Sequence, residues 1–208
     1  MLPITANWNG QTGVLPTSDV LSYERRKTLF SPVLQKYVLY TLSIKENVCL
    51  KEKTAAKRLN AVFESSDLAS LIRKLPKGYD TQIGKEIDPE GINPSGGEGQ
   101  KIAIARMLYH DRPIFILDEP TATLDPIAEN EIYTRVHSAI KGRAAVMITH
   151  RLSAVRLADK VAVFDDGHVA EYGTHNELYA KGGIYTEMFD KQAKFYRDTS
   201  PESEEAVH

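Results

Sequence analysis

The chain has few of the features that commit a protein to a membrane, to an oxidising compartment or to nucleic acid. Its 208 residues include one cysteine, Cys49, which excludes an internal disulfide and fits a reducing compartment. No apolar run approaches the roughly 18 residues that span a bilayer, and the N-terminus has no basic-then-apolar signal pattern. A net charge of −2 gives no indication of nucleic-acid binding. The 42% of hydrophobic residues predicts one globular domain with room for a subdomain.

A glycine-rich turn opens a predicted helix. Ser95, Gly96 and Gly97 precede a run in which apolar residues recur at helical spacing as far as residue 112. The start of a helix offers free N–H groups and a positive partial charge, and glycines leave no side chain to block an anion. Taken alone, Ser-Gly-Gly is usually a plain turn before a helix. Read as a site, it predicts a place for a phosphate-sized anion.

An apolar strand that ends in two acids follows this helix. Residues 113–117 form an apolar run too short for a helix, which predicts a strand buried on both faces, and Asp118 and Glu119 come directly after it. Open parallel sheets bind ligands at the carboxyl ends of their strands. One acid can hold Mg²⁺ and the next can polarise an attacking water. The plain alternative is a strand that simply reaches solvent.

In this order and at this separation, the two stretches resemble the signature motif and the Walker B motif of the ATP-binding-cassette (ABC) ATPases. The resemblance runs from about residue 16 to about residue 196 and is strongest with exporter-type ABC transporters. It implies an α/β fold, a truncated P-loop NTPase-like sandwich with a small helical subdomain. It also implies ATP and Mg²⁺ as cofactors, and a transmembrane ABC subunit and a second ABC ATPase domain as partners. The implied location is the cytoplasmic face of the cell membrane, held there through the transmembrane subunit.

The resemblance gives each candidate site residue a role. Asp118 is the implied Mg²⁺ ligand, Glu119 the general base, and His150 the contact to the γ-phosphate. Gln35, after a β-prone run at residues 28–34, is implied to reach Mg²⁺ or the attacking water. The residues that the resemblance places against nucleotide are Ser95, Gly96, Gly97, Glu98 and Asp125.

Plain structural alternatives stand beside these roles. Asp125 before Pro126 fits a helix N-cap, His150 a surface residue after a strand, and Gln35 a solvated loop residue.

The chain also departs from the family pattern. Pro94 stands where the signature usually has leucine, Lys36 where an acid is usual, and Ala122 where a serine is usual. The 208 residues contain no Gly-x4-Gly-Lys-Ser/Thr, the loop that cradles phosphates in P-loop ATPases. The chain therefore resembles an ABC ATPase domain that begins after the Walker A helix.

Three functions stay open at this point. The chain is an ATPase subunit of an ABC exporter, or a non-catalytic domain that donates its signature motif to another ABC ATPase, or a non-functional remnant. In each case we expect the isolated chain to hydrolyse ATP negligibly, because the missing loop supplies most of the positioning and charge stabilisation.

The expected organisation has four parts: residues 1–34 as a degenerate N-terminal segment, 35–110 with the Q-loop, helical subdomain and signature, 111–196 with Walker B, D-loop, H-loop and the remaining α/β part, and 197–208 as an acidic tail. Residues 1–13 are expected to be loop. Strands at 114–117, 145–149 and 161–164 are expected in one sheet, the first two parallel, with Asp118, Glu119 and His150 at one edge.

Local signals predict further elements. Helices are expected at 54–65 and 67–75, with Thr54 and Ser66 or Asp67 as N-caps. Asp165-Asp166-Gly167 predicts a hairpin turn, Thr174 to Glu177 a capping box, and residues 188–195 a last helix. Because the family's N-terminal strands are not evident, we expect exposed core, low stability alone and self-association or a partner.

Overall fold

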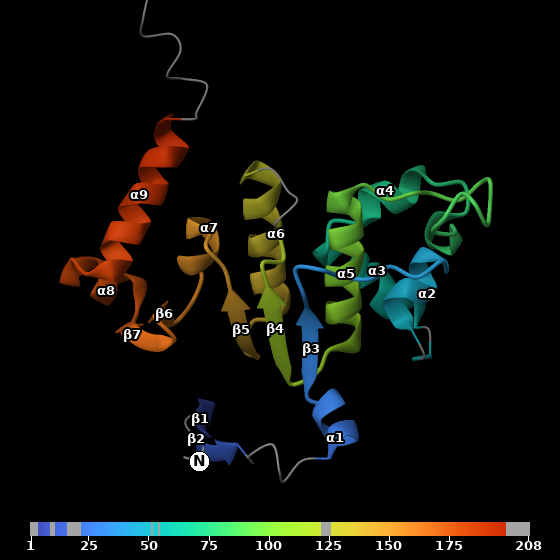
Figure 1. The fold of residues 1–208 in the computed structure, drawn as a ribbon. Coiled ribbons are helices and arrows are strands. Elements are labelled where there is room, and N and C mark those ends of the chain that lie inside the picture. The colour runs from blue at the N-terminus through green and yellow to red at the C-terminus, as the bar shows by residue number, and fades with distance from the viewer. Residues whose placement is uncertain are drawn as a thin grey trace, which may run out of the picture. The chain divides into compact units, whose positions relative to one another are not determined.

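The computed structural model of the chain describes residues 4–8, 11–15, 22–50, 52–53, 55–121 and 126–198. Contacts divide the chain into two compact units, Met1–Ile148 and Thr149–His208. Figure 1 shows the elements of each unit. The predictions for Thr54, Ala122 and Asp125 and for the acidic tail from residue 199 lie outside the described residues.

The first unit is built on a parallel sheet of three strands in the order β3-β4-β5. The strands are β3 (Phe30–Val33), β4 (Ile114–Asp118) and β5 (Ala144–Ile148), and α6 (Pro126–Ala139) connects the last two. Both strand pairs are parallel, so the predicted parallel pairing around residues 114–117 is confirmed. The carboxyl ends of β4 and β5 therefore lie at one edge of the sheet.

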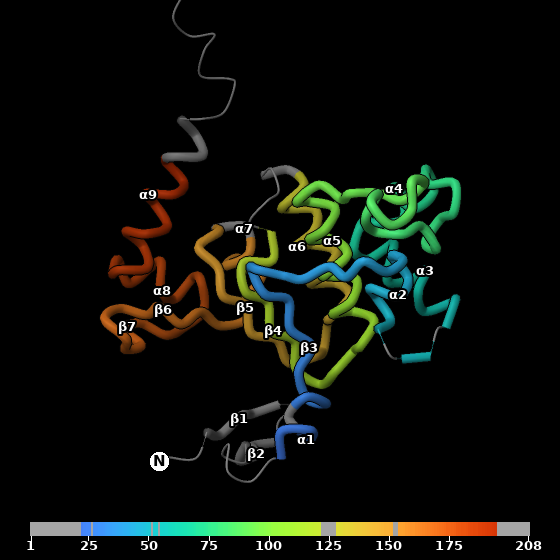
Figure 2. The backbone as a smooth tube through the Cα atoms, turned by 45° about the vertical axis from the view of Figure 1, so that its right-hand side comes forward, coloured from blue at the N-terminus to red at the C-terminus, as the bar shows by residue number. Residues whose placement is uncertain are grey.

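Helices between β3 and β4 form the expected helical part of this unit. They are α2 (Ile44–Cys49), α3 (Ala56–Ser65), α4 (Ala69–Lys74), the short 3₁₀ helix η1 (Gly78–Asp80) and the long α5 (Gly96–His110). Figure 2 shows α2, α3 and α4 gathered beside α5, which leads back to the sheet. The fold is thus α/β with a helical subdomain.

The core of this unit lies between the helices and one face of the sheet. Val33, Phe115 and Leu117 are buried there, together with Ile102 of α5 and Val136 of α6. The predicted apolar stripe of α3 and α4 is confirmed, since it consists of the buried or half-buried residues Leu59, Val62, Phe63, Leu68, Leu71 and Ile72.

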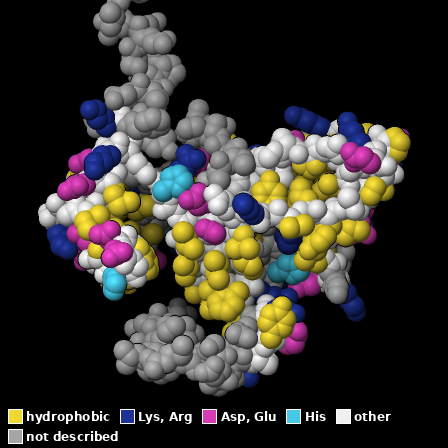
Figure 3. Space-filling view, in the orientation of Figure 1, with side chains coloured by type: hydrophobic (Ala, Val, Ile, Leu, Met, Phe, Trp, Pro, Cys, Tyr) yellow, Lys and Arg dark blue, Asp and Glu magenta, His cyan; other side chains and the backbone are white. Residues whose placement is uncertain are grey.

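The other face of the sheet carries exposed apolar side chains. Val146 and Ile148 of β5 are each 54% exposed, and Phe30 of β3 is also exposed. Figure 3 shows apolar side chains over these strands on the near face. Within the described residues, β5 is therefore a strand with an exposed apolar face and not a buried one. Periodicity identified a strand here, but it carries no information about which neighbours cover the strand.

The outer edge of β3 is modified by a proline. The N–H of Ile114 donates to the carbonyl of Leu29 at 3.0 Å. In a parallel ladder this register turns the backbone groups of Ser31 toward β4 and those of Phe30 and Pro32 away from it. Pro32 therefore removes an N–H from the free edge of β3 rather than from the ladder.

The predicted N-cap of α4, Ser66 or Asp67, is wrong. Ala55 precedes α3 and Leu68 precedes α4, and neither helix has a side-chain cap. Asp67 has φ of +58°, and its carboxylate accepts from Lys101 of α5 at 2.6 Å. The Asp67 side chain therefore forms an ion pair with Lys101 and not the helix N-cap that the local sequence predicts.

The second unit contains a hairpin and two packed helices. Its elements are α7 (Leu152–Val155), β6 (Val161–Asp165), β7 (His168–Gly173), α8 (His175–Lys181) and α9 (Ile184–Asp198), the last longer than predicted. The hairpin prediction is confirmed, since Asp166 and Gly167 have φ of +44° and +75°. The predicted capping box of α8 is confirmed as well.

The prediction that residues 161–164 share a sheet with β4 and β5 is wrong. In the described residues β6 pairs only with β7, antiparallel, in a sheet of its own. A two-residue turn brings β7 alongside β6 at little loop-closure cost, which favours local pairing.

The N-terminal region also differs from expectation. β1 (Ile4–Trp8) and β2 (Gln11–Leu15) pair as an antiparallel hairpin where we expected loop, and α1 (Tyr23–Lys27) precedes β3. No helix in the described ranges is long and apolar enough to cross a bilayer.

Candidate functional site

The start of α5 is the best-defined part of the candidate site. Ser95 is the N-cap, and its hydroxyl accepts from the N–H of Glu98 at 3.3 Å. The Glu98 carboxylate accepts in return from the N–H of Ser95 at 2.8 Å. The first intrahelical bond runs from Gly99 N–H to Ser95 C=O, so the N–H groups of Gly96 and Gly97 have no acceptor inside the helix. Ser95 and Gly96 are exposed, and Gly97 is half-buried.

The end of β4 holds the two predicted carboxylates in an uncommon backbone geometry. Asp118 is the last residue of β4, and Glu119 follows with φ of +44° although it precedes Pro120. A left-handed conformation at such a residue costs about 1–3 kcal/mol and persists only where the surroundings impose it. The N–H of Glu119 donates to Ile148 C=O at 2.9 Å, which anchors it to the end of β5.

A second anchor of Glu119 comes from α5. Gln100, fully buried in α5, donates from Nε2 to the carbonyl oxygen of Glu119 at 3.3 Å. Sequence reasoning did not single out Gln100. The available signal was a polar amide among the apolar residues of a helix, which needs a partner when buried. Through this contact the structure brings α5 and the Asp118-Glu119 pair together.

The loop after β3 also contacts the start of α5. Gln35 and Lys36 are exposed, and Tyr37 is half-buried with its hydroxyl donating to Gly96 C=O at 2.6 Å. Sequence reasoning did not identify Tyr37, since this contact joins residues 59 positions apart. The structure thus places the loop that carries Gln35 against the start of α5.

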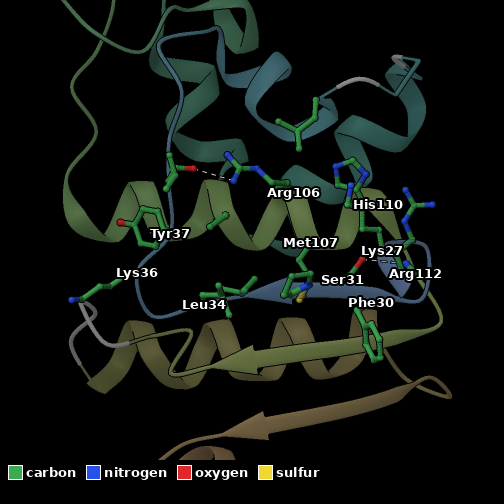
Figure 4. Close-up of a pocket in the computed structure, with 15 residues that line it drawn as sticks. Lys27, Phe30, Ser31, Leu34, Lys36, Tyr37, Arg106, Met107, His110 and Arg112 are labelled. Atoms are coloured by element: carbon green, nitrogen blue, oxygen red, sulfur yellow. Dashed lines mark hydrogen bonds between the residues drawn. The ribbon is translucent and has the colours of Figure 1, made fainter. Parts of the chain in front are cut away.

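A groove lies between β3 and α5. It has a volume of about 370 Å³, and its lining includes Leu34, Tyr37, Met107 and His110. Figure 4 shows these side chains around it, with Arg106 reaching from α5 to the loop after β3. Arg106 donates to Val38 C=O at 3.0 Å. The groove is therefore walled by the same loop that carries Gln35.

The predicted roles of Asp125 and His150 stay predictions. Asp125 lies outside the described residues. His150 stands two residues after β5 and belongs to the second unit, where Gln192 donates to its carbonyl. The predicted approach of His150 to Glu119 therefore stays a prediction.

Metal binding in this region would depend on few protein ligands. The described residues include no group of three or more His, Cys, Asp or Glu side chains able to hold a metal ion. Asp118 is a single, partly exposed carboxylate at the sheet edge. That donor set fits Mg²⁺, which keeps several waters and takes one or two carboxylates beside substrate phosphates.

Comparisons with known proteins identify the family of the chain. The family model described as ABC transporter matches residues 8–122. The chain is 39% identical over 164 residues to an ATP-dependent lipid A-core flippase of Alkalilimnicola ehrlichii, covering 78% of the chain and 27% of the relative. It is 35% identical over 174 residues to the flippase of the same name from Burkholderia orbicola, covering 84% of the chain and 28% of the relative.

A solved structure also resembles the chain. A bacterial Atm1-family ABC exporter with ATP bound superimposes with a TM-score of 0.77 at 31% identity, covering 89% of the chain and 31% of the exporter. The chain thus spans little more than a quarter of the length of the curated relatives it matches. On the family match and this fold, the chain belongs to the ABC transporter family and has the α/β, P-loop NTPase-like fold of that family's ATP-binding domain.

Proposed function

We propose that this chain forms the signature-presenting part of the ATP-binding domain of an exporter-type ABC transporter. In this proposal Ser95, Gly96 and Gly97 complete a nucleotide site whose phosphates are held by a second ABC ATPase domain. The observation that carries the proposal is the exposed, N-capped start of α5. Nothing in that half-site depends on a phosphate loop elsewhere in the chain.

The chemistry of this half-site follows from its hydrogen bonds. Because the Ser95 hydroxyl accepts from Glu98 N–H, its own proton stays available to donate to a phosphate oxygen. The N–H groups of Gly96 and Gly97 and the positive end of the α5 dipole favour an anion at the same place. Pro94 does no harm there, since a position before a helix start tolerates the loss of an N–H.

The second candidate is ATP hydrolysis at the chain's own Asp118 and Glu119. The strained, doubly anchored backbone of Glu119 favours it, because such strain concentrates at functional sites. Asp118 would hold Mg²⁺, Glu119 would accept a proton from the attacking water, and Gln35 and His150 would orient that water and the γ-phosphate. Mg²⁺, when bound, would neutralise phosphate charge. Without a phosphate loop, however, the two carboxylates face a polyanion and repel it.

The partners follow from the same proposal. The relatives that the chain resembles are named as a flippase and an exporter, and the chain covers only part of each. We therefore infer a transmembrane partner and a second ATP-binding domain, with the chain on the inner face of the membrane. The groove between β3 and α5 is the surface we assign to the transmembrane partner.

The decisive experiment is complementation. A complete ATP-binding domain of an exporter is prepared with its own signature serine replaced, so that its homodimer has little turnover. Adding this chain should restore ATP hydrolysis at least tenfold. Gly97→Asp should return turnover to background, because a carboxylate at the helix start repels phosphate. Asn93→Asp adds the same charge upstream of the helix and should have little effect.

Glu119→Gln separates the two candidates. In the signature-donating role this substitution leaves the restored turnover nearly unchanged. Equal losses from Gly97→Asp and Glu119→Gln, or no restoration with the exporter's domain, would refute that role. Turnover by the chain alone that disappears in Glu119→Gln would instead establish the second candidate.

A further inference from the structure

We infer that Tyr37 is a positioning residue that fixes the direction of the Gly97 N–H at the start of α5. The inference rests on the proposed function, in which that N–H meets a phosphate. Tyr37 lies two residues after Gln35, and its hydroxyl donates to Gly96 C=O at 2.6 Å. Figure 4 shows Tyr37 near one end of α5 and Met107 and His110 further along the helix.

Peptide planarity carries the effect from one glycine to the next. The C=O of Gly96 and the N–H of Gly97 belong to the same peptide group, which is planar and trans. A hydrogen bond that fixes the carbonyl therefore also fixes the opposed N–H. Two successive glycines have more backbone freedom than any other pair, so an external restraint matters more here than in an ordinary helix turn.

Gly99 supports the same conclusion independently. A Cβ at Gly99 would lie 2.7 Å from Tyr37 Oη and 3.0 Å from its Cε2. Glycine inside a helix is disfavoured relative to alanine by about 1 kcal/mol. The close approach of the Tyr37 ring explains its presence, because any side chain at residue 99 would push the hydroxyl away from Gly96.

The hydroxyl is suited to donate at neutral pH. Partial burial raises the pKa of Tyr37 above its ordinary value, which keeps the proton on the oxygen. Arg106 holds the next carbonyl of the loop, that of Val38, at 3.0 Å. The loop after β3 is thus fastened at two successive residues, and a shift of Gln35 would be transmitted to Gly96 through Tyr37.

The test uses Tyr37→Phe, which removes one oxygen and keeps the ring. Tyr40→Phe on the same loop is the matched control, since no hydrogen bond of the Tyr40 hydroxyl is found in the described part of the chain. In the full chain labelled at glycine nitrogen, we expect the relaxation order parameter of the Gly97 amide to fall from about 0.85 to below about 0.7 in Tyr37→Phe only. The melting temperature should change equally little in both variants.

The functional arm measures restored turnover in the complementation assay. Tyr37→Phe should lower it about fivefold to tenfold, the worth of one hydrogen bond, with Tyr40→Phe unchanged. Gly99→Ala should lower it similarly, and Tyr37→Phe in that background should add little. An unchanged Gly97 amide in Tyr37→Phe would overturn the inference. A loosened Gly97 without any restored turnover by the unsubstituted chain would sink the proposed function and leave the positioning role intact.

Discussion

At the scale of single residues, the second unit depends on one carboxylate. Glu171 of β7 is buried and accepts from the N–H of Tyr185 at the start of α9 at 2.9 Å. Lys181 pairs with it at 3.3 Å. The hydrogen bond from the Tyr185 backbone and the pairing with Lys181 lower the pKa of Glu171 below its ordinary value of 4.5. The charged form is therefore the one that holds β7 to α9.

The stability of the folded chain should therefore depend on pH through the Glu171 carboxylate. Because the folded pKa lies below the unfolded one, the contribution of Glu171 is fully present above about pH 5 and is lost as pH falls through the folded value. Glu171→Gln should lower the melting temperature by several degrees at pH 7, and the difference should shrink as the pH falls below 4.5 and through the folded pKa. Thermal melts of both chains across this range measure it. A difference that is constant with pH would show that the charge does not matter.

Gly183 offers a control that leaves the titratable groups unchanged. A Cβ at this position would lie 2.0 Å from a carboxylate oxygen of Glu171, so Gly183→Ala must displace the carboxylate. We expect it to reproduce the destabilisation at pH 7. In a chain that already carries Glu171→Ala the clash is absent, and Gly183→Ala should then cost little.

At the scale of elements, α5 joins three parts of the candidate site. Its first turn takes Tyr37 from the loop after β3, and Gln100 in its second turn holds Glu119 at the end of β4. A helix that contacts both elements moves them together. Displacement of α5 should thus change the signature and the Asp-Glu pair at once.

Replacing the buried amide of Gln100 tests whether α5 restrains Glu119. Gln100→Leu keeps the volume but leaves the Glu119 carbonyl without that donor, at a cost of about 1–3 kcal/mol in the free energy of unfolding. Gln82→Leu removes a solvent-exposed hydrogen bond from the half-buried Gln82 to Thr41 C=O and should cost less than about 1 kcal/mol. Urea unfolding of the two variants decides it. Equal costs would mean that Gln100 does not restrain Glu119.

Sequence alone predicted the elements whose signals are local. The start of α5, the hairpin turn at Asp166 and the capping box of Thr174 depend on residues within four positions, and all three were predicted. The contacts of Tyr37 and Gln100 were not, because they join residues far apart in the chain. The same limit explains the α4 cap, where Asp67 pairs with Lys101 instead. Roles of the site residues came from the resemblance and stay predictions.

At the scale of the whole molecule, the uncovered face of the three-stranded sheet is the feature that most lowers the stability of the chain alone. Parallel sheets are normally covered on both faces, yet Val146 and Ile148 are exposed here in the described part of the chain. Exposed apolar surface of this kind drives association.

We therefore expect the chain alone to bind an apolar dye and to self-associate at micromolar concentration. Val146→Lys should reduce both, because a charge opposes burial of that face. Ser138→Lys, on the exposed side of α6, is the matched control and should change neither. Dye fluorescence and sedimentation velocity measure the two effects. A monomeric chain without dye binding would show that the face is covered.

The proline of β3 sets how far such association could go through strand pairing. A linear polymer needs units with two reactive ends, and Pro32 leaves the β3 end of this sheet short of a donor while the β5 end keeps all of its own. Only the β5 edge of this sheet can then pair fully with another strand. When two β5 edges pair, neither sheet keeps a complete edge for a further partner. Pairing through the two edges of this three-stranded sheet would therefore terminate at the dimer, and growth beyond the dimer through the same edges would need Pro32 to be replaced first.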